Sequence, residues 1–194
     1  PALVSCGTVE HPNALTVAWT GIVNTHPPMT YVSVRPSRFS YDLIKNSGEF
    51  VVNLPSSPLT KAVDFCGVRS GKDIDKFALM GLNASPGQFV SAPLIEECPV
   101  NLECKVTQVL PLGSHDMFLA EILAVHVEDS LIDATGKLHL ERAKLLGFAH
   151  GEHYELGHRT GTFGFSVRKK PKNHRHRKNP SGKKMPGCQK RGKQ

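Results

Sequence analysis

Long apolar runs are missing from this sequence of 194 residues. No stretch approaches the roughly 20 consecutive apolar residues that a membrane helix needs, and no secretory signal peptide is recognisable. Hydrophobic residues make up 39% and charged residues 21% of the chain. This composition is typical of a globular domain with a buried core and excludes a chain that is disordered throughout.

Paired cysteine motifs are missing too. The five cysteines are odd in number and irregular in spacing, and no C-x-x-C pair occurs; they are Cys6, Cys66, Cys98, Cys104 and Cys188. The pattern argues against a disulfide framework and predicts a reducing, cytoplasmic location. We expect Cys6, Cys98 and Cys104 to be small buried hydrophobes. Cys66, in a polar glycine-rich context, is the cysteine best placed to lie near a ligand.

Acidic residues are absent from the end of the chain. Residues 168–194 hold 12 Lys or Arg and no Asp or Glu, so residues 1–167 carry 12 basic and 17 acidic side chains, a formal charge of −5. We expect a domain over 1–170 and a basic, disordered or extended tail over 171–194. The tail is either a solvated extension or an arm that binds nucleic acid or another polyanion. The acidic body favours the first interpretation, because it offers no basic surface to continue an arm.

The dinucleotide fingerprint G-x-G-x-x-G and a regular alternation of strands with helices are also absent, which argues against a doubly wound α/β fold. Strand patterns occur over 2–9, 14–21, 29–34 and 49–54. A long antiparallel hairpin is predicted over 100–113 and 117–129, joined by a Gly-Ser-His-Asp turn. Short helices are predicted up to Ser47-Gly48, over 59–65 and over 73–80. The fold class is therefore mainly β with inserted helices, arranged as an antiparallel barrel.

The most informative stretch that is present is VSVRPSRFSYDLI, Val32 to Ile44, where a strand pattern gives way to a helix. Arg35 and Arg38 supply guanidinium groups suited to phosphate. The start of the helix adds free N–H groups and the positive end of its dipole. Ser37 or Ser40 is expected to cap the helix. The alternative is two solvated arginines beside a routine helix cap, and the stretch alone does not decide.

A second pattern, NALTVAWTG from Asn13 to Gly21, places Asn, Thr, the only Trp and a Gly on one strand. We call the segment from Arg35 to Arg38 the arginine corner. We expect the strand from Asn13 to Gly21 immediately before this corner in the sheet order. A flat aromatic cofactor needs an apolar slot with a few donors at its polar edge. The segment Thr16 to Trp19 fits that requirement, although core packing would also account for these residues.

Four ordered blocks together resemble the flavin reductase-like family, the FMN-binding split-barrel group that includes flavoredoxin. They are N-x-x-T-x-A-W-T-G, P-P-M-T-Y-V-S-V-R-P-S-R, G-E-F-V-V-N-L-P and D-F-C-G-V-R-S-G-K-D-I-D-K-F. The match continues through H-G-E-H-Y-E-L-G to G-T-F-G-F-S-V-R-K-K and so covers residues 1 to about 170. The resemblance implies a six-stranded split β-barrel, usually a homodimer, with FMN near the subunit interface.

By this resemblance the strand from Asn13 to Trp19 runs beside the isoalloxazine ring. The residues that would hold the phosphate end are Ser33, Arg35, Arg38 and Ser40. The S-G-K-D-x-D-K-F block lies near the cofactor. The family often has Thr where Ser40 stands, and either hydroxyl can donate to phosphate. The candidate cofactor-binding residues are Asn13, Thr16, Val17, Ala18, Trp19, Ser33, Val34, Arg35, Ser37, Arg38, Phe39, Ser40, Lys72, Asp75, Lys76 and Phe77.

A bound flavin carries the redox chemistry itself, so no dedicated acid, base or nucleophile is required. The predicted function is NAD(P)H-dependent flavin reduction or flavoredoxin-type electron transfer, with a nicotinamide or a redox protein as the donor. The alternative is a non-catalytic module that binds flavin, or that binds a polyanion through the basic tail.

Histidines gather in GFAHGEHYELGH, where His150, His153 and His158 are spaced by three and five residues. These spacings fit no standard metal motif, so no metal site is predicted. His150 or Tyr154 on the substrate side of the flavin is one interpretation. Packing or surface positions are the other.

Overall fold

The computed structural model describes residues 1–168 of the chain. The chain divides into a first unit of residues 1–158 and a second unit that begins at Arg159. The predicted tail, 171–194, lies outside the described residues, as does Cys188. Among residues 1–168, no helix is both long and apolar enough to cross a membrane.

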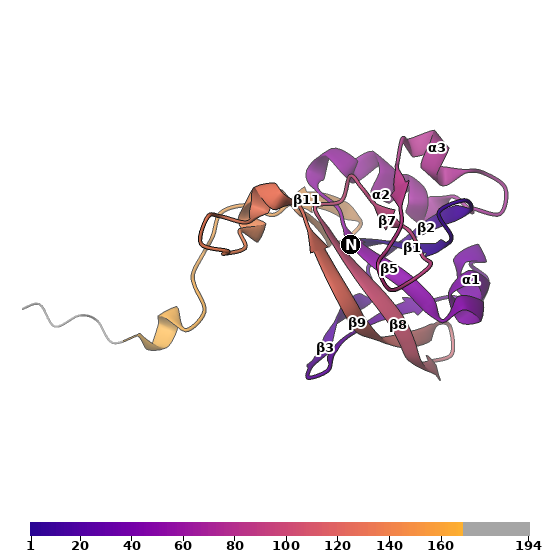
Figure 1. Ribbon diagram of the computed structural model, residues 1–194, viewed down its shortest axis with the longest axis horizontal. Coiled ribbons are helices and arrows are strands. Elements are labelled where there is room, and N and C mark those ends of the chain that lie inside the picture. Colours follow the sequence, from indigo (N-terminus) through magenta and orange to yellow (C-terminus); the bar gives the residue numbers. More distant parts are fainter. Residues whose placement is uncertain (169–194) are drawn as a thin grey trace, which may run out of the picture. The chain divides into compact units, whose positions relative to one another are not determined.

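Strands dominate the first unit (Figure 1). Its strands are β1 (Ala2–Gly7), β2 (Pro12–Val17), β3 (Thr20–Thr25), β4 (Pro28–Val34), β5 (Glu49–Leu54), β6 (Ala84–Ser85), β7 (Leu94–Ile95), β8 (Val100–Pro111), β9 (Asp116–Val127), β10 (Leu146–Ala149) and β11 (Glu152–Glu155). Its α-helices are α1 (Phe39–Ser47), α2 (Thr60–Val68) and α3 (Lys76–Met80). Short 3₁₀ turns lie at Ser57–Leu59, Asp129–Leu131 and Leu140–Arg142, and one in the second unit lies at Phe165–Val167.

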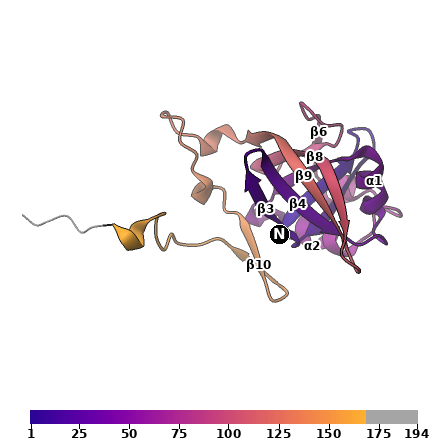
Figure 2. The same ribbon diagram turned by 90° about the horizontal axis from the view of Figure 1, so that it is seen from below.

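Seven strands form one antiparallel sheet in the order β2-β1-β5-β8-β9-β4-β3. The long hairpin of β8 and β9 lies at its centre, between β5 and β4. Figure 2 shows β3, β4, β9 and β8 side by side. Two small hairpins, β6–β7 and β10–β11, stand outside this sheet.

The sheet curls into a barrel that stays open between its edges. β2 and β3 are the edge strands, yet only Ala18 and Trp19 separate them in sequence. In a flat sheet these edges would lie about 29 Å apart, whereas the link between them spans about 10 Å at most. The Ser33 N–H donates to the Trp19 carbonyl at 3.0 Å, so Trp19 already belongs to the β4 side. The chain therefore crosses the split at Ala18, and in the described part no ladder joins β2 to β4.

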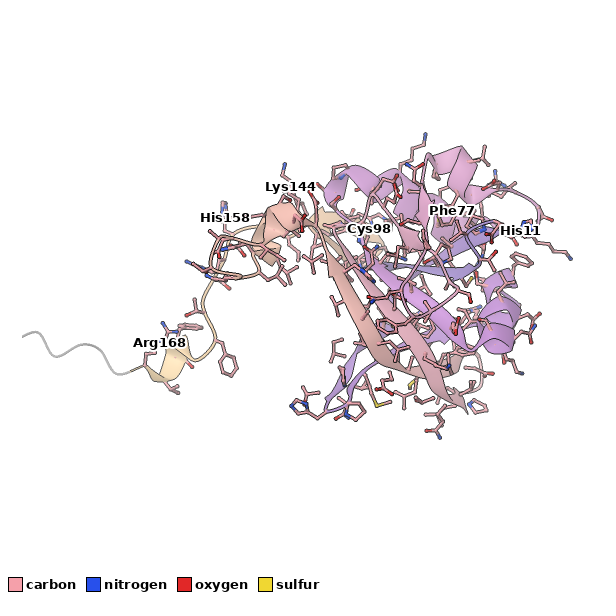
Figure 3. All side chains as sticks on the ribbon, viewed as in Figure 1. His11, Phe77, Cys98, Lys144, His158 and Arg168 are labelled. Atoms are coloured by element: carbon pink, nitrogen blue, oxygen red, sulfur yellow. The ribbon has the colours of Figure 1, made fainter. Side chains whose placement is uncertain are left out.

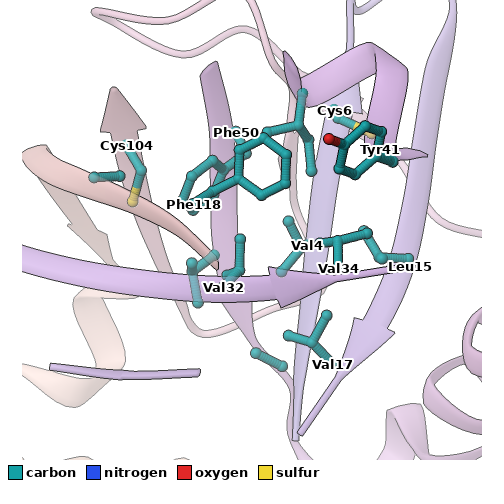
Figure 4. Close-up of a cluster of buried hydrophobic side chains, with 14 residues drawn as sticks. Val4, Cys6, Leu15, Val17, Val32, Val34, Tyr41, Phe50, Cys104 and Phe118 are labelled. Atoms are coloured by element: carbon teal, nitrogen blue, oxygen red, sulfur yellow. The ribbon is translucent and has the colours of Figure 1, made fainter. Parts of the chain in front are cut away.

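A first hydrophobic core fills the inside of the barrel (Figure 4). In β1, Val4 and Cys6 point into this core while Leu3 belongs to a second cluster, as the two-residue period of a strand requires. α1 adds Tyr41, whose ring meets that of Phe118 edge-on with centroids 5.4 Å apart. Burial of these side chains holds α1 against the barrel, and so fixes the corner that precedes it.

A second core lies between the outer face of β1 and β2 and the helices α2 and α3. Leu3 and Ala14 from the strands pack here with Val63 and Phe77 from the helices. Cys98 belongs to the same cluster, and Figure 3 labels it together with Phe77. Because both faces of β1 are covered, its sequence is an almost continuous apolar run.

Most of the predicted elements are confirmed. β5, the β8–β9 hairpin and the three helices lie where the sequence placed them, with shifts of up to three residues at their ends. α1 ends as expected, since Gly48 adopts φ 69° and its N–H donates to the Ile44 carbonyl at 2.8 Å. Cys6, Cys98 and Cys104 are free and buried, as predicted.

Three predictions about the main sheet were wrong. The strand expected over 14–21 breaks at Ala18 and Trp19, because these residues cross the split, and β3 begins at Thr20. The main sheet therefore has seven strands, one more than the six expected. β2 is also not next to β4 in the sheet order; the two strands face each other across the split.

Candidate functional site

The site begins at the corner between β4 and α1. β4 ends at Val34, and the Arg38 N–H donates to the Arg35 carbonyl at 2.9 Å, which closes a tight turn. Pro36 stiffens this turn because its ring fixes φ. Arg38 is the cap residue, with extended backbone angles of φ −80° and ψ 137°, and α1 begins at Phe39.

The predicted serine cap was wrong, for a reason that concerns the site. No side chain hydrogen-bonds to the cap position of α1. Ser37 is exposed one residue too early, and Ser40 lies inside the first turn. The Ser40 side chain is buried and its hydroxyl accepts a hydrogen bond from the Asn13 amide at 2.7 Å. The Tyr41 N–H donates to the Arg38 carbonyl at 2.9 Å, and the start of α1 keeps the N–H groups of Phe39 and Ser40 and the positive end of its dipole for an anion.

Two adjoining pockets open at this corner and share Leu15, Thr16 and Arg38. The strand pocket, of about 320 Å³, is lined by Leu15, Thr16, Val17, Trp19, Ser33, Val34, Arg35, Arg38 and His115. The helix pocket, of about 80 Å³, is lined by Leu15, Thr16, Ser37, Arg38, Phe39, Ser40, Cys66, Gly67, Arg69, Ser70, Gly71 and Lys76. Together they follow the split in the barrel from the end of β2 to the start of α1.

Basic side chains line both pockets and acidic ones line neither. Arg35 and Arg38 are exposed at the strand pocket, and Arg69 is exposed at the helix pocket. The three ion pairs within residues 1–168 all involve histidine, so no arginine or lysine of the two pockets has a carboxylate partner there. Permanent positive charge without a counter-charge makes this cleft attractive to an anion.

Lys76 is a buried cation in the wall of the helix pocket. Its side chain is 3% exposed, and its ammonium donates to the carbonyls of Ala14 at 2.6 Å and Cys66 at 3.1 Å. Burial lowers the pKa of Lys76, since the charged form loses solvation. The two hydrogen bonds tie β2 to α2, so Lys76 stabilises the pocket wall.

Gly71 allows the loop before α3 to approach β2 closely. A Cβ atom at this position would lie 1.9 Å from the Asn13 Oδ1. Asn13 is 5% exposed, and besides Ser40 its amide donates to the Cys6 sulfur at 3.4 Å. A side chain at residue 71 would displace Asn13, which links β2 to the start of α1.

Trp19 and His115 form the outer wall of the strand pocket. Trp19 is 62% exposed, and its ring meets that of His115 edge-on, with centroids 6.0 Å apart and planes at 63°. His115 comes from the turn between β8 and β9, and the pairing of β9 with β4 carries it here. In the sequence it belongs to a polar turn, and only long-range strand pairing places it at the site.

The corner and the β2 segment meet at the two pockets. Eleven of the candidate cofactor-binding residues line them: Thr16, Val17, Trp19, Ser33, Val34, Arg35, Ser37, Arg38, Phe39, Ser40 and Lys76. Cys66, the cysteine expected near a ligand, also lines the helix pocket, and burial raises its thiol pKa. Arg69, Ser70 and His115 line the pockets but were missed.

The remaining candidate cofactor-binding residues line neither the strand pocket nor the helix pocket. Lys72 and Asp75 line a separate surface hollow, and the Asp75 carboxylate caps α3 by accepting from the Ala78 N–H at 3.0 Å. Phe77 is 4% exposed and packs in the second core. Ala18 borders a third pocket.

His150 and Tyr154 lie on the β10–β11 hairpin and are exposed. Neither lines the strand pocket or the helix pocket. The Tyr154 hydroxyl donates to the Glu152 carboxylate. From the same hairpin, Phe148 and His153 line the third pocket.

An antiparallel split barrel with a positively charged cleft along its split defines the class of this protein. The family model of the flavin reductase like domain matches residues 1–156. The chain therefore belongs to the flavin reductase-like family.

Individual relatives agree with this assignment. An uncharacterized protein of Archaeoglobus fulgidus is 37% identical over 125 residues, which is 64% of this chain and 71% of the relative. An NADPH-flavin oxidoreductase of Streptomyces viridifaciens is 26% identical over 142 residues, 71% of this chain and 72% of the relative. The solved structure of flavoredoxin from Desulfovibrio vulgaris (Miyazaki F) superposes with a TM-score of 0.80 at 30% identity, covering 86% of this chain and 91% of that chain.

Proposed function

We propose that this chain binds FMN at the split of its barrel and acts as an oxidoreductase, by NAD(P)H-dependent flavin reduction or by flavoredoxin-type electron transfer. The observation that carries the proposal is the pair of adjoining pockets at the start of α1, lined by cations and by no carboxylate. FMN is a dianion at its phosphate end and a flat aromatic ring at the other. The permanent cations and the free helix start suit the first, and the apolar strand segment suits the second.

The roles of individual residues follow from their chemistry. Arg35 and Arg38 carry planar, permanently charged donors, and the Ser37 hydroxyl lies between them in sequence. We assign these three residues and the first N–H groups of α1 to the phosphate. The β2 segment, with Val17 and Trp19, is assigned to the ring. Lys72, Asp75 and Phe77 stay in the proposal only as residues that support the loop beside the site.

When bound, the flavin supplies the electron-accepting and electron-donating chemistry. The chain binds and orients it, and covers part of its surface with Trp19 and His115, which limits access of water. The absence of a dinucleotide fingerprint means that a nicotinamide donor would approach the flavin itself rather than a Rossmann unit.

The test is an anaerobic titration. The purified chain is loaded with FMN, the free flavin is removed, and NADH or NADPH is added while the absorbance of the oxidised flavin is followed. Bleaching by either nucleotide supports the reductase. Bound flavin that resists both nucleotides but is bleached by dithionite supports electron transfer from a protein donor. A chain that takes up neither FMN nor FAD contradicts the proposal, and a preference for FAD corrects the cofactor.

We also propose a homodimer in the cytoplasm. The edge strand β3 exposes Ile22 (64%) and Val23 (50%), apolar side chains that a second copy would cover. The free thiols of Cys6, Cys66, Cys98 and Cys104 suit a reducing compartment. Light scattering with size-exclusion chromatography measures the mass of the particle, and a monomer at micromolar concentration would contradict the dimer.

A further inference from the structure

One residue, Asp116, contacts the chain on both sides of the arginine corner. It is the first residue of β9 and pairs with Val34, the last residue of β4, which directly precedes Arg35. On the other side of the corner, the Tyr41 hydroxyl of α1 donates to the Asp116 carboxylate at 2.6 Å. The chain therefore leaves Asp116 at Val34, passes through the corner and returns to Asp116 at Tyr41.

The backbone alone holds this end of β9 weakly. Asp116 forms the last pair of two ladders, with Val34 of β4 and with Pro111 of β8. Pro111 has no N–H and cannot donate to its ladder. The end of a ladder also opens more readily than its middle, because it has neighbours on one side only. The hydrogen bond from Tyr41 supports Asp116 where the backbone pairing is weakest.

Tyr41 is itself held firmly. It is 6% exposed, and its ring meets the buried ring of Phe118 edge-on, with centroids 5.4 Å apart. Figure 4 shows both rings in the first core. The hydrogen bond to Asp116 raises the pKa of Tyr41, so the hydroxyl stays protonated and remains a donor at neutral pH.

Asp116 also follows directly after His115, which forms the outer wall of the strand pocket with Trp19. Both of these residues, with Ser33, line the strand pocket and an outer hollow of about 460 Å³. The His115–Trp19 pair is therefore a wall shared by the two. The His115 ring lies 3.0 Å from the hydroxyl of Ser114, its neighbour in the same turn. Its place in the wall thus depends on how the turn itself is held.

We propose that Asp116 is a positioning residue of the FMN site: held by Tyr41, it keeps the arginine corner and the His115–Trp19 wall at a fixed spacing. The inference rests on the proposed function, because this spacing separates the ends assigned to the phosphate and to the ring. Neither Asp116 nor Tyr41 lines the strand pocket or the helix pocket, so both act through their neighbours. A site with both ends fixed loses less conformational entropy when its ligand binds.

The first test uses the full chain without any ligand. Tyr41→Phe removes the hydroxyl but leaves the ring in the core, so the variant should fold. Amide hydrogen exchange, followed by mass spectrometry, measures how often the turn over 112–116 opens. Exchange there should be about fivefold faster, the order expected for one lost hydrogen bond. Exchange in β5 should not change, whereas a general loss of stability would accelerate both segments.

The second test compares FMN with riboflavin, which has the same ring but no phosphate. Fluorescence titration gives the two dissociation constants. Tyr41→Phe should weaken FMN about fivefold and riboflavin less than twofold, because only FMN engages both ends of the site. A hydroxyl that served stability alone would leave the ratio of the two constants unchanged in the folded chain.

Three further variants complete the comparison. Ser130→Ala removes another hydroxyl that donates to a carboxylate, that of Glu128 at 2.7 Å, and should change neither exchange in the turn nor either affinity. Asp116→Asn keeps an oxygen that can accept from Tyr41 and should exchange like the parent chain. Asp116→Ala has no acceptor and should reproduce the faster exchange, so it replaces Tyr41→Phe if that variant does not fold. The Asp116 variants are compared by exchange, since loss of a negative charge would itself favour an anion.

The two tests fail separately. The inference is overturned if Tyr41→Phe leaves exchange in the turn unchanged, or if FMN and riboflavin weaken by the same factor. It is also overturned if Asp116→Asn opens the turn as much as Asp116→Ala does. If the chain takes up neither flavin, the proposed function is contradicted, while faster exchange confined to the turn would still uphold the positioning role of Asp116.

Discussion

At the residue scale, the arginine corner carries the strongest claim about the ligand. Arg38 lines both pockets and has no carboxylate partner within the described residues. Its guanidinium is therefore free to pair with an anion, and its position directly before α1 adds to the field of the helix start.

Arg38→Ala should weaken FMN about ten- to hundredfold, because one hydrogen bond to a charged group contributes about 1.5–3 kcal/mol. Lys61→Ala, which removes an exposed cation of α2 that lines neither pocket, is the control. Quenching of flavin fluorescence measures the affinity. An unchanged dissociation constant for Arg38→Ala would show that the phosphate lies elsewhere.

Gly71→Ala should lower the free energy of unfolding by about 1–3 kcal/mol, the usual cost of overpacking. The added methyl group would collide with Asn13 and disturb its hydrogen bond to Ser40. Gly157→Ala is the matched control, because a Cβ at that position meets nothing within 4 Å. Urea unfolding compares the variants, and equal midpoints would show that the loop before α3 moves aside without cost.

At the scale of elements, a buried carboxylate fastens the connection between β6 and β7 to β8. Glu103 is 0% exposed and accepts hydrogen bonds from the N–H groups of Gln88, Phe89 and Val90 at 2.6–2.9 Å. The Nε2 of His126 on β9 lies 2.5 Å from the Glu103 Oε1, the oxygen that also accepts from the Gln88 N–H. The Ser91 N–H of the same connection donates to the Glu49 carboxylate at 2.8 Å, so two carboxylates hold this loop.

This arrangement predicts a pH dependence of stability. Burial alone would raise the pKa of Glu103, but the three N–H donors and His126 outweigh it and hold the pKa below the usual range. A carboxyl with a lowered pKa stabilises the fold above its unfolded value of about 4.3, and this contribution is lost as the pH falls through the folded pKa.

Glu103→Gln should therefore be less stable than the parent chain by about 1–3 kcal/mol at pH 7, and the difference should shrink as the pH falls below about 4. Glu96→Gln, at an exposed position in the same region, should show neither effect. Urea unfolding at a series of pH values gives the curves. A difference that is constant down to pH 3 would mean that Glu103 acts through its shape and not its charge.

Elements with strong local signals could be predicted from the sequence. The Val- and Phe-rich β5, the hairpin at Gly-Ser-His-Asp and the glycine that ends α1 each depend on neighbours in the chain. The serine cap was wrong because α1 begins at Phe39, so Arg38 and neither serine occupies the cap position. The Ser40 hydroxyl instead accepts from Asn13, 27 residues away, a contact that the local sequence does not reveal. His115 and Arg69 could not be found, since only the packing of distant elements brings them to the pockets.

At the scale of the whole molecule, the pockets assigned to the cofactor lie within the first unit of the chain. The strand pocket and the helix pocket are lined by residues between Leu15 and His115. We therefore expect the proposed FMN site not to require the nine Lys or Arg of residues 171–194.

Deletion of residues 171–194 should leave the FMN dissociation constant unchanged within about twofold, since no bond to the phosphate is removed. The same fluorescence titration, repeated at low and high salt, separates direct contact from long-range attraction. Loss of flavin binding at both salt concentrations would assign the tail to the site.

Because the barrel is open between β2 and β4, a bound cofactor would also stabilise the fold. Hydrogen-bonded ladders hold each neighbouring pair of strands in the seven-stranded sheet, but β2 and β4 meet without one. A molecule bound along this seam contacts both β2 and β4 and joins them where the backbone does not. Each tenfold excess of ligand over its dissociation constant then adds about 1.4 kcal/mol to the stability of the fold. Loss of the flavin would loosen the architecture as well as stop the chemistry, and amide protons beside the seam would be the first to exchange with solvent.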